Sequence, residues 1–520
     1  MSTPDCRHVV VIGAGLSGLA AACHLLGAGY RVTVLERDAD VGGRAGRIER
    51  DGYAFDTGPT VMTMPELLAE SFEAVGANMA ELLTLRRLDP AYRACFADGS
   101  TLRVRADLEA SIDEVRATCG PADAAALRDF AGWLRGLYEL EMPNFIARNF
   151  DRPTDLAWPP GPALRLLRSG ALASLRSIVR RRFRDERLRR LLSFQALYAG
   201  LSPVTASGIY AVITYMDVIA GVYAADGGMH AIPAAMAAAV RGAGGEIVTG
   251  APVERILLAD GPTGAVRGVG MADGRSVDAD AVVCTVDTPV AYRELLPGLH
   301  PPRRVGRPRY SPSAVVWHVG TRGAPGPEVA HHNIHFGREW GPSFRALIRD
   351  GRLMPDPSLL VSVPTLTDPS LAPSGSSVLY VLEPVPNTDG QVDWAQERPR
   401  MQDRLAGRLV ELGYPLDVVV DEFVDPRDWE SAGMQSGTPF ALAHTFAQTG
   451  PFRPPNVHRK APGLVFAGSG TVPGVGVPMV LISGKLAAER IVAMDTPRDA
   501  GSKPARHPAR SRSTTAGARA

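Results

Sequence analysis

Apolar and polar residues alternate in two distinct ways at the start of the chain. Residues 9–12 are four β-branched apolar residues in a row, which indicates a strand buried on both faces. Residues 16–26 carry a helical pattern, and residues 31–35 alternate like a second strand. This strand–helix–strand order predicts the first unit of a parallel sheet.

The turn between the first strand and the helix has the spacing G-x-G-x-x-G. Gly13 permits a tight turn, Gly15 lets the backbone approach a pyrophosphate, and Gly18 lets the helix pack on the strand. Ala14 lies inside the same turn, and the helix N-terminus offers N–H groups to the pyrophosphate. Glu36 ends the second strand, where a carboxylate accepts both ribose hydroxyls of an adenosine. The acid disfavours a 2′-phosphate, so the pattern predicts a dinucleotide other than NADP.

A second glycine-rich segment follows Glu36. It reads VGGRAGR over residues 41–47 and DTGPT over residues 56–60. We expect a loop that folds over the nucleotide, with a guanidinium in reach of phosphate. The candidate residues here are Gly43, Arg44, Gly58 and Pro59. A glycine-rich surface turn beside a solvated arginine is the alternative.

A third glycine-rich segment lies near the end of the chain. We expect a buried strand over 464–467, a loop over 468–476 and a helix over 477–491. A flavin along this loop would direct its N1–C2=O edge at the helix N-terminus, whose dipole would favour the reduced, negatively charged form. The candidate residues are Gly468, Gly476, Val477, Pro478 and Met479.

The rest of the chain mixes helical and strand patterns. We expect helices over 65–75, 108–140 with a break near Gly120, 163–192, 193–225, 231–243 and 401–411. We expect a hairpin over 92–104, a small antiparallel sheet over 246–258, 265–271 and 275–286, and a second sheet within 303–384. Residues 496–520 lack periodicity and predict a disordered tail.

The 163–192 segment is strongly basic, with ten arginines against Asp185 and Glu186. One interpretation is an ordinary solvated face beside a packed apolar stripe. The other is a helix that lies on an anionic bilayer. The residues of this segment do not by themselves decide between the two.

Composition excludes several classes of function. The 520 residues are 45% hydrophobic and 21% charged, with a formal net charge of +1, so nothing indicates nucleic acid. The sequence contains no stretch of about 18 uninterrupted apolar residues, so we predict no membrane span. The five cysteines are scattered, and the His331–His332 pair has no carboxylate or cysteine beside it, so we expect no metal site. Arg148 and Asp151 are the nearest candidates for polar groups at a flavin, with a surface ion pair as the alternative.

The chain resembles the bacterial phytoene desaturases, a branch of the FAD-dependent carotenoid desaturases within the amine-oxidase-like flavoproteins. The segments that carry the resemblance are VVVIGAGLSGLAAA, VGGRAGRIERDGYAFDTGP, LLSFQALYAGLSP, the GGMHAIPAAM run, LTDPSLAPSGSSVLYVLEPVPN and GLVFAGSGTVPGVGVP. They extend from Val9 to about Ala493. Two residues depart from the family pattern: Val472 replaces the usual His or Arg, and Met479 replaces the usual Gly.

The resemblance implies FAD as cofactor and phytoene and partly desaturated carotenes as substrates. The implied chemistry is hydride loss from an allylic carbon to flavin, with a proton lost from the neighbouring carbon and a quinone or oxygen as electron acceptor. It also implies that the backbone of Val253 contacts adenine. The alternatives are a carotene isomerase, an oxidase of amines or protoporphyrinogen, and a non-catalytic prenyl-binding protein. No acid–base residues are evident, so the catalytic residues stay unassigned.

We therefore predict an α/β chain with a discontinuous Rossmann-like FAD-binding domain, a mixed-sheet substrate domain and a helical membrane-facing part. The FAD-binding domain is expected in three parts, 1–85, 226–295 and 458–495. The helical membrane-facing region is expected over 86–225, the mixed sheet over 296–457 and the tail over 496–520. The implied C40 hydrocarbon cannot stay in water, at ~0.8 kcal/mol per exposed methylene, so we expect the 163–192 segment to dock on the bilayer. The expected location is cytoplasmic, peripheral to the inner face of the cell membrane.

Overall fold

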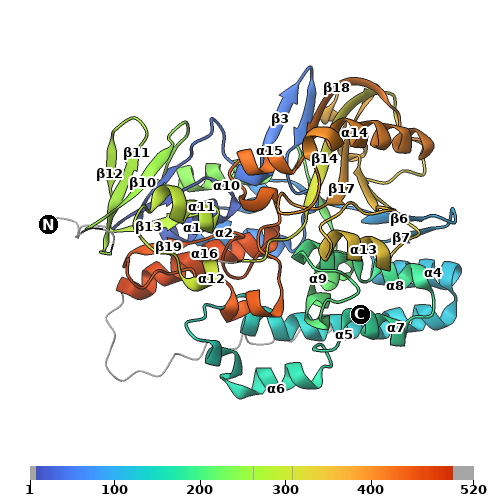
Figure 1. Ribbon diagram of the computed structural model, residues 1–520, viewed down its shortest axis with the longest axis horizontal. Helices are drawn as coiled ribbons and strands as arrows, with labels where there is room; N and C mark the ends of the chain where they lie inside the picture. The colour runs from blue at the N-terminus through green and yellow to red at the C-terminus, as the bar shows by residue number, and fades with distance from the viewer. Residues whose placement is uncertain (1–6, 260, 262, 307, 496–520) are drawn as a thin grey trace, which may run out of the picture.

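The computed structural model describes residues 7–259, 261, 263–306 and 308–495. Two sheets organise the chain, one on either side of a large internal cavity. The predicted tail at 496–520 lies outside the described residues. Figure 1 shows the second sheet, with β14, β17 and β18, at the upper right of the molecule and a group of helices below it.

The first sheet is parallel and contains the amino-terminal strand at its centre. The strand order is β19 (Leu464–Phe466), β13 (Ala281–Cys284), β1 (His8–Ile12), β2 (Arg31–Leu35) and β9 (Glu246–Val248). The predictions for β1, β2 and β19 agree with these bounds. The predicted antiparallel strands over 246–258 and 275–286 are wrong at their outer ends, because β9 and β13 join the parallel sheet.

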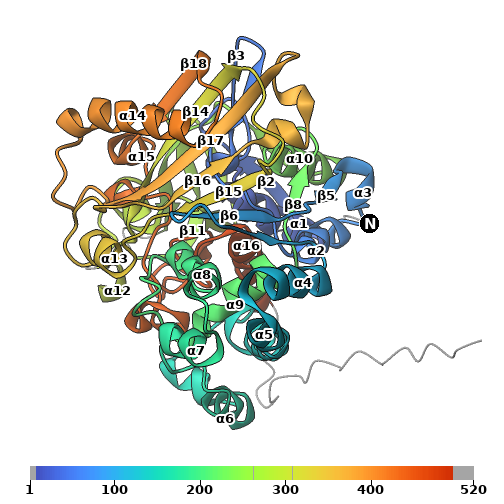
Figure 2. The ribbon, with the colours of Figure 1, turned by 90° about the vertical axis from the view of Figure 1, so that its right-hand side faces the viewer.

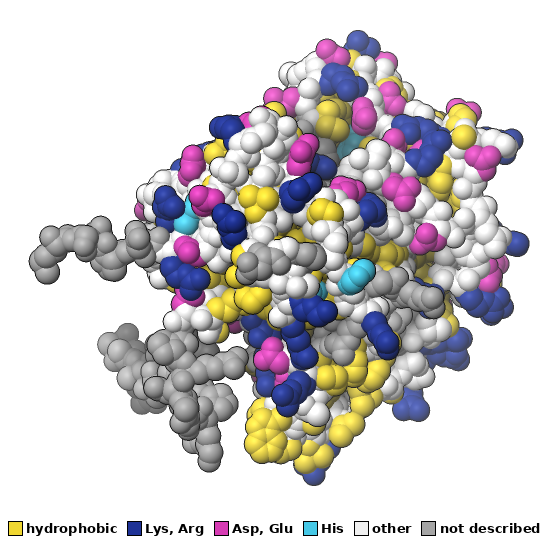
Figure 3. Space-filling model, turned by 60° about the vertical axis from the view of Figure 1, so that its left-hand side comes forward, with side chains coloured by type: hydrophobic (Ala, Val, Ile, Leu, Met, Phe, Trp, Pro, Cys, Tyr) yellow, Lys and Arg dark blue, Asp and Glu magenta, His cyan; other side chains and the backbone are white. Residues whose placement is uncertain are grey.

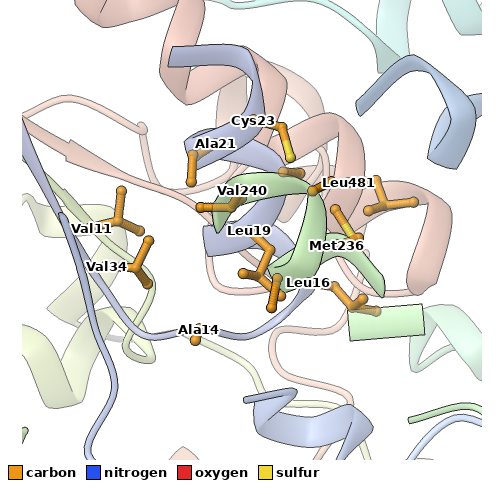
Figure 4. Close-up of a cluster of buried hydrophobic side chains, with 14 of the residues drawn as sticks. Val11, Ala14, Leu16, Leu19, Ala21, Cys23, Val34, Met236, Val240 and Leu481 are labelled. Atoms are coloured by element: carbon orange, nitrogen blue, oxygen red, sulfur yellow. The ribbon is translucent and has the colours of Figure 1, made fainter. Parts of the chain in front are cut away.

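The two faces of this sheet are covered by different structures. Val9 and Val11 face helices α1 (Leu16–Gly27), α10 (Ala231–Gly242) and α16 (Val477–Asp495), and α2 (Pro65–Ala74) packs on the same group. Figure 4 shows Val11, Leu19 and Leu481 of this cluster. Val10 and Ile12 face the opposite way, onto an antiparallel sheet of β10 (Val253–Leu258), β11 (Val266–Met271) and β12 (Ser276–Asp278).

The second sheet is mixed and brings together distant parts of the chain. Its order is β18 (Asp417–Val424), β14 (Ser313–Arg322), β17 (Ser376–Val385), β16 (Leu359–Ser362), β15 (His332–Phe336), β6 (Tyr92–Phe96) and β7 (Thr101–Val104). Strands β15 and β6 are parallel and the other neighbours antiparallel. The predicted hairpin over 92–104 is confirmed as β6 and β7, which form one edge of this sheet (Figure 2).

Alternate residues of the second sheet face its two opposite sides. Trp317, Val319 and Val381 pack against α14, which runs from Trp394 to Glu411 and so begins seven residues before the predicted helix. Val316 and Leu382 face the cavity. The sheet is therefore the wall that separates its own core from the cavity.

Several short helices complete the molecule below the mixed sheet. They are α4 (Leu108–Cys119), α5 (Pro121–Glu141), α6 (Pro160–Arg168), α7 (Leu175–Arg182), α8 (Glu186–Leu191) and α9 (Ala211–Thr214). The predicted break near Gly120 is confirmed. The continuous helix predicted over 163–192 is instead three helices, because turns at Gly170 (φ +76°) and at Phe183 separate them.

The apolar helix predicted over 193–225 is wrong. The segment forms a 3₁₀ turn at Phe194–Ala199, then the short helix α9, a π turn at Tyr215–Ile219 and strand β8 (Tyr223–Ala225). Gly200 has a φ of +69°, and a Cβ there would lie 2.1 Å from the Ser311 hydroxyl. Gly200 therefore ends the 3₁₀ turn in the left-handed conformation, where its backbone packs too close to Ser311 for any side chain.

Candidate functional site

One cavity, with a volume of about 760 Å³, extends from the carboxyl ends of β1 and β2 to the mixed sheet. Its first half is formed by the three glycine-rich segments, and its second half by apolar side chains. Eleven of the predicted cofactor residues line it: Gly13, Gly15, Glu36, Gly43, Arg44, Gly58, Pro59, Val253, Gly468, Gly476 and Val477. Ala14, Gly18, Pro478 and Met479 do not.

The first glycine turn has three different steric situations. Gly13 has a φ of +98°, and a Cβ there would lie 2.3 Å from Thr285 Oγ1. A Cβ at Gly18 would lie 2.0 Å from the carbonyl oxygen of Gly13, so this glycine is needed for packing α1 on β1. A Cβ at Gly15 would meet only ordinary contacts, 3.8 Å from the Gly42 carbonyl oxygen. Gly15 therefore leaves space that the protein itself does not use.

Glu36 lies at the end of β2 and is 5% exposed. Its carboxylate accepts hydrogen bonds from the backbone N–H of Ala14 at 2.7 Å and of Asp38 at 3.0 Å. Ala14 thus acts by orienting Glu36 rather than by lining the cavity. The remaining lone pairs of the carboxylate are available to hydroxyl donors in the cavity, as a ribose requires.

The second glycine-rich segment crosses over the first. Gly42 donates its N–H to the carbonyl oxygen of Ala14 at 2.9 Å, and a Cβ on Gly43 would lie 3.3 Å from the Cα of Gly15. Gly58 is equally constrained, since its Cβ would lie 1.8 Å from the carbonyl oxygen of Arg44. These close approaches form a narrow cradle of backbone around the cavity.

Arg44 joins this cradle to the closing loop. Its guanidinium donates to the Pro439 carbonyl oxygen at 2.8 Å and to the Ser469 hydroxyl at 2.7 Å, and it lies 3.9 Å from the carboxylate of Asp287. The Arg44 side chain remains 32% exposed. It can therefore hold the loop and still present N–H groups to an anionic ligand.

The closing helix α16 begins at the cavity, where Gly476 and Val477 form part of the wall. Pro478 occupies its first turn, as expected from the sequence. Met479 and Val472, the two departures from the family pattern, pack away from the cavity against Ile482 and Leu486. They therefore do not line the part of the cavity where a flavin would lie.

Sequence reasoning missed two charged residues in this region. Asp287 follows β13 and lines the cavity; its Oδ2 accepts from the Gln435 N–H at 3.1 Å, and its buried Oδ1 has no hydrogen-bond partner among the described residues. Arg453 is fully buried and donates to the carbonyl oxygens of Ser469 at 2.6 Å and Thr471 at 2.8 Å. Burial lowers the pKa of Arg453 to about 10, so it stays a cation beneath the closing loop.

Other sequence candidates lie away from the cavity. Arg148 donates to the Trp158 carbonyl oxygen at 3.0 Å, and Asp151 pairs with Arg490 at 2.7 Å, so the expected Arg148–Asp151 pair is wrong. His331 and His332 form a pair with ring centroids 4.4 Å apart.

The second half of the cavity is apolar. Its lining includes Phe194, Leu197, Ile334, Phe336, Trp340, Phe344, Met354, Leu359, Leu360, Leu382 and Phe440. Such a surface fits a hydrocarbon and offers it few polar contacts. The backbone cradle, the Glu36 carboxylate and the apolar half together fit a dinucleotide cofactor that reaches an apolar substrate.

Comparisons with known proteins agree with this geometry. The family model described as flavin containing amine oxidoreductase matches residues 16–492. The chain is 50% identical over 493 residues to the phytoene dehydrogenase of Streptomyces griseus, covering 93% of this chain and 95% of that protein. It is 38% identical over 492 residues to the zeta-carotene-forming phytoene desaturase of Myxococcus xanthus, covering 94% of each.

A solved structure has the same fold. An oxidoreductase from Methanosarcina mazei aligns with a TM-score of 0.60 at 18% identity and covers 94% of this chain and 100% of its own. Family, cavity and nucleotide-binding segments all indicate FAD. The chain belongs to the flavin-containing amine oxidoreductase family.

Proposed function

We propose that this protein is an FAD-dependent desaturase that introduces double bonds into phytoene, toward lycopene, in carotenoid biosynthesis. The observation that carries the proposal is the continuity of the cavity, which joins the glycine cradle to an apolar surface. The identities with the phytoene dehydrogenase and desaturase relatives support the same substrate.

Bound FAD supplies the hydride acceptor. The protein's own residues bind the substrate, orient it and exclude water from it. The apolar wall around Ile334, Phe336 and Leu382 removes water from the reacting carbons and holds an extended chain against the cradle. An allylic position stabilises developing positive charge through the polyene itself, so few polar groups are required there.

The test is turnover of phytoene by the FAD-loaded protein in liposomes. We expect the long-wavelength absorbance of conjugated products to appear with an electron acceptor. Trials with a quinone and with oxygen, each alone, identify the acceptor, for which we propose either of the two. If phytoene is unchanged with both, the proposal is wrong. A product that forms only anaerobically from reduced flavin, without net oxidation, would instead identify a carotene isomerase.

We also propose that the protein is cytoplasmic and docks peripherally on the inner face of the cell membrane through the region of 163–192. Figure 3 shows hydrophobic side chains gathered at the lower end of the molecule, with basic side chains beside them. Within 163–192, Leu164 (45%), Leu167 (60%) and Leu172 (47%) are exposed, and Trp158 (71%) is exposed just before it in sequence. Among the described residues, no helix has the length and apolarity to cross a bilayer.

A basic groove supports the same docking surface. It has a volume of about 710 Å³ and is lined by Arg176, Arg180, Arg189, Arg190, Arg309, Arg345 and Arg349. Trp340 and Phe344 line both this groove and the apolar cavity. Headgroups held in the groove would therefore bring the bilayer within one aromatic layer of the substrate site.

Not every arginine in the region is free for lipid. Arg182 lies over the Trp133 ring at 4.8 Å, so its replacement would disturb packing. We therefore choose Arg176, Arg180 and Arg181, which are exposed. Each is expected to contribute about 1 kcal/mol near an anionic surface.

The test is sedimentation of the FAD-loaded protein with anionic liposomes. The triple Gln variant of these arginines should sediment less than the wild type, and rising salt should release the wild type. A matched control replaces Arg241 of α10, Arg255 of β10 and Arg267 of β11, which are exposed outside 163–192, and should bind as the wild type does. Equal binding by the first variant would place the docking surface elsewhere.

A further inference from the structure

A buried carboxylate without a cationic partner lies beside the cavity. Asp217 is 2% exposed, in the π turn Tyr215–Ile219. It accepts hydrogen bonds from the Tyr92 hydroxyl and, at 3.3 Å, from the Gln195 side-chain amide. Among the described residues Asp217 makes no salt bridge. A carboxylate in such surroundings is expensive to keep ionised.

Two tyrosines connect Asp217 with the cavity. Tyr92 on β6 is fully buried; its hydroxyl donates to Asp217 and lies in reach of the Tyr198 side chain. Tyr198 lines the cavity, beside Phe194. The three side chains therefore lie in sequence between the substrate space and a buried acid.

The surroundings of the path keep it uncharged apart from Asp217. His332 also faces Tyr92, with its ring 5.5 Å from that of Tyr92, and burial lowers its pKa to about 4. Gln195, which faces Asp217 from the Phe194–Ala199 turn, is neutral and contacts the Thr214 hydroxyl at 3.4 Å. Burial raises the pKa of Asp217 to about 6, so near neutral pH it can both hold and release a proton.

The path also lies near the cofactor cradle. His332 Nε2 is 3.0 Å from the carbonyl oxygen of Thr60, which follows Gly58 and Pro59 and lines the cavity with them. Tyr198 lines the same cavity as Thr60, so the three side chains begin in the space where desaturation must release a proton.

We propose that Tyr198 accepts the proton that substrate loses during desaturation, and that Tyr92 and Asp217 carry it away. The inference rests on the proposed function. In the step, one allylic C–H bond breaks and its electron pair leaves as hydride to the bound FAD. The C–H bond of the adjacent carbon breaks, and its electron pair becomes the new double bond. Its proton joins the Tyr198 oxygen as the Tyr198 proton passes to Tyr92 and the Tyr92 proton to the Asp217 carboxylate. Tyr198 is the catalytic residue; Tyr92 and Asp217 act through it.

The test compares three variants that preserve shape: Tyr198→Phe, Tyr92→Phe and Asp217→Asn. Each should lower kcat for phytoene by about 100-fold or more, with little change in KM or in bound FAD. In the wild type kcat should fall as pH drops through about 6, where Asp217 becomes protonated, and this acid limb should be absent from the variants. Tyr138→Phe makes the same chemical change in a tyrosine stacked on Tyr215 and outside the cavity lining, and it should keep the wild-type rate.

A second measurement needs no turnover. Infrared spectra of the purified protein should show the C=O stretch of a buried carboxylic acid that grows as pH falls through about 6. The band should be missing in Asp217→Asn and shifted in Tyr92→Phe. If Tyr198→Phe or Asp217→Asn keeps kcat within about twofold, the relay is wrong even where phytoene is turned over. A wild type that leaves phytoene unchanged would refute the proposed function instead, and an absent infrared band would then refute the relay separately.

Discussion

Gly15 and Gly18 belong to one motif, but the structure predicts opposite consequences for a methyl group at each. At Gly15 the backbone has φ −74° and ψ 173°, which any residue can adopt, and a Cβ would lie 3.8 Å from the Gly42 carbonyl oxygen. At Gly18 a Cβ would lie 2.0 Å from the Gly13 carbonyl oxygen and 3.3 Å from Val11 Cγ1. The first position has room in the protein, and the second has none.

We therefore expect Gly15→Ala to fold normally and to lose FAD. The free energy of unfolding of the cofactor-free protein should change by less than about 1 kcal/mol, because a glycine-to-alanine change at a compatible φ/ψ is mild. The added methyl group would occupy the space into which the pyrophosphate must fit. We expect the FAD Kd to rise at least about 100-fold, which corresponds to about 2.7 kcal/mol. Gly15→Val should be purified colourless.

Gly18→Ala should fail in the other way. Backbone atoms cannot move aside as a side chain can, so α1 must shift away from β1, and overpacking of this kind costs about 1–3 kcal/mol or more. Urea unfolding of both cofactor-free variants measures the stability, and flavin fluorescence titration measures the Kd. If Gly15→Ala retains stoichiometric FAD with wild-type affinity, the pyrophosphate does not cross Gly15 and the cradle is misassigned.

Three further predictions concern single charged residues. Glu36→Ala removes the acceptor of two backbone N–H groups and of the ribose hydroxyls. In the titration, FAD affinity should fall by orders of magnitude while FMN affinity stays unchanged. Equal FAD affinity would contradict the ribose contact. Arg404→Ala leaves Glu383 buried without the bidentate partner it contacts at 2.8 and 2.9 Å, so urea unfolding should show a loss of about 3 kcal/mol that Glu383→Gln partly restores. Asp217 binds a proton more tightly when folded, with a pKa of about 6 against 3.8, so wild-type stability should fall as pH rises from about 4 to 6. Asp217→Asn should then be more stable than the wild type at pH 8 by up to about 3 kcal/mol. Urea unfolding measured at several pH values tests this, and a variant less stable than the wild type at pH 8 would contradict the uncompensated charge.

Local chemistry was enough to predict the cofactor half of the fold. The valines of β1, the glycines that follow and Glu36 specify one strand–helix–strand unit through contacts a few residues apart. Strands β9 and β13 are recognisable as strands, but their parallel pairing with β2 and β1 depends on partners more than a hundred residues away. Alternation gives the period of a strand and does not identify its neighbour.

The 193–225 segment shows a second limit. Its apolar residues fit a helix as well as any packed irregular chain, and the decisive contact is between Gly200 and Ser311, which are far apart in sequence. The proposed relay of Tyr198, Tyr92 and Asp217 could not be predicted from the sequence for the same reason. Tyr92 and Asp217 are 125 residues apart, and each alone is an ordinary residue in an apolar context. Arg453 likewise has no local signal, because its partners are backbone carbonyls that any sequence supplies.

The arrangement of groove and cavity follows from the energetics of the substrate. Burying each methylene is worth ~0.8 kcal/mol relative to water but almost nothing relative to lipid, so the apolar cavity cannot draw a C40 chain out of a bilayer by affinity alone. Transfer of the substrate from the bilayer to the cavity then depends on a route along which the hydrocarbon does not meet water. The basic groove can hold headgroups, while Trp340 and Phe344 form the layer that it shares with the cavity. In the proposed docking, a hydrocarbon crossing at these two aromatic rings would leave lipid and enter the cavity without exposure to water. The basic charge would then align the bilayer with the cavity rather than bind the substrate.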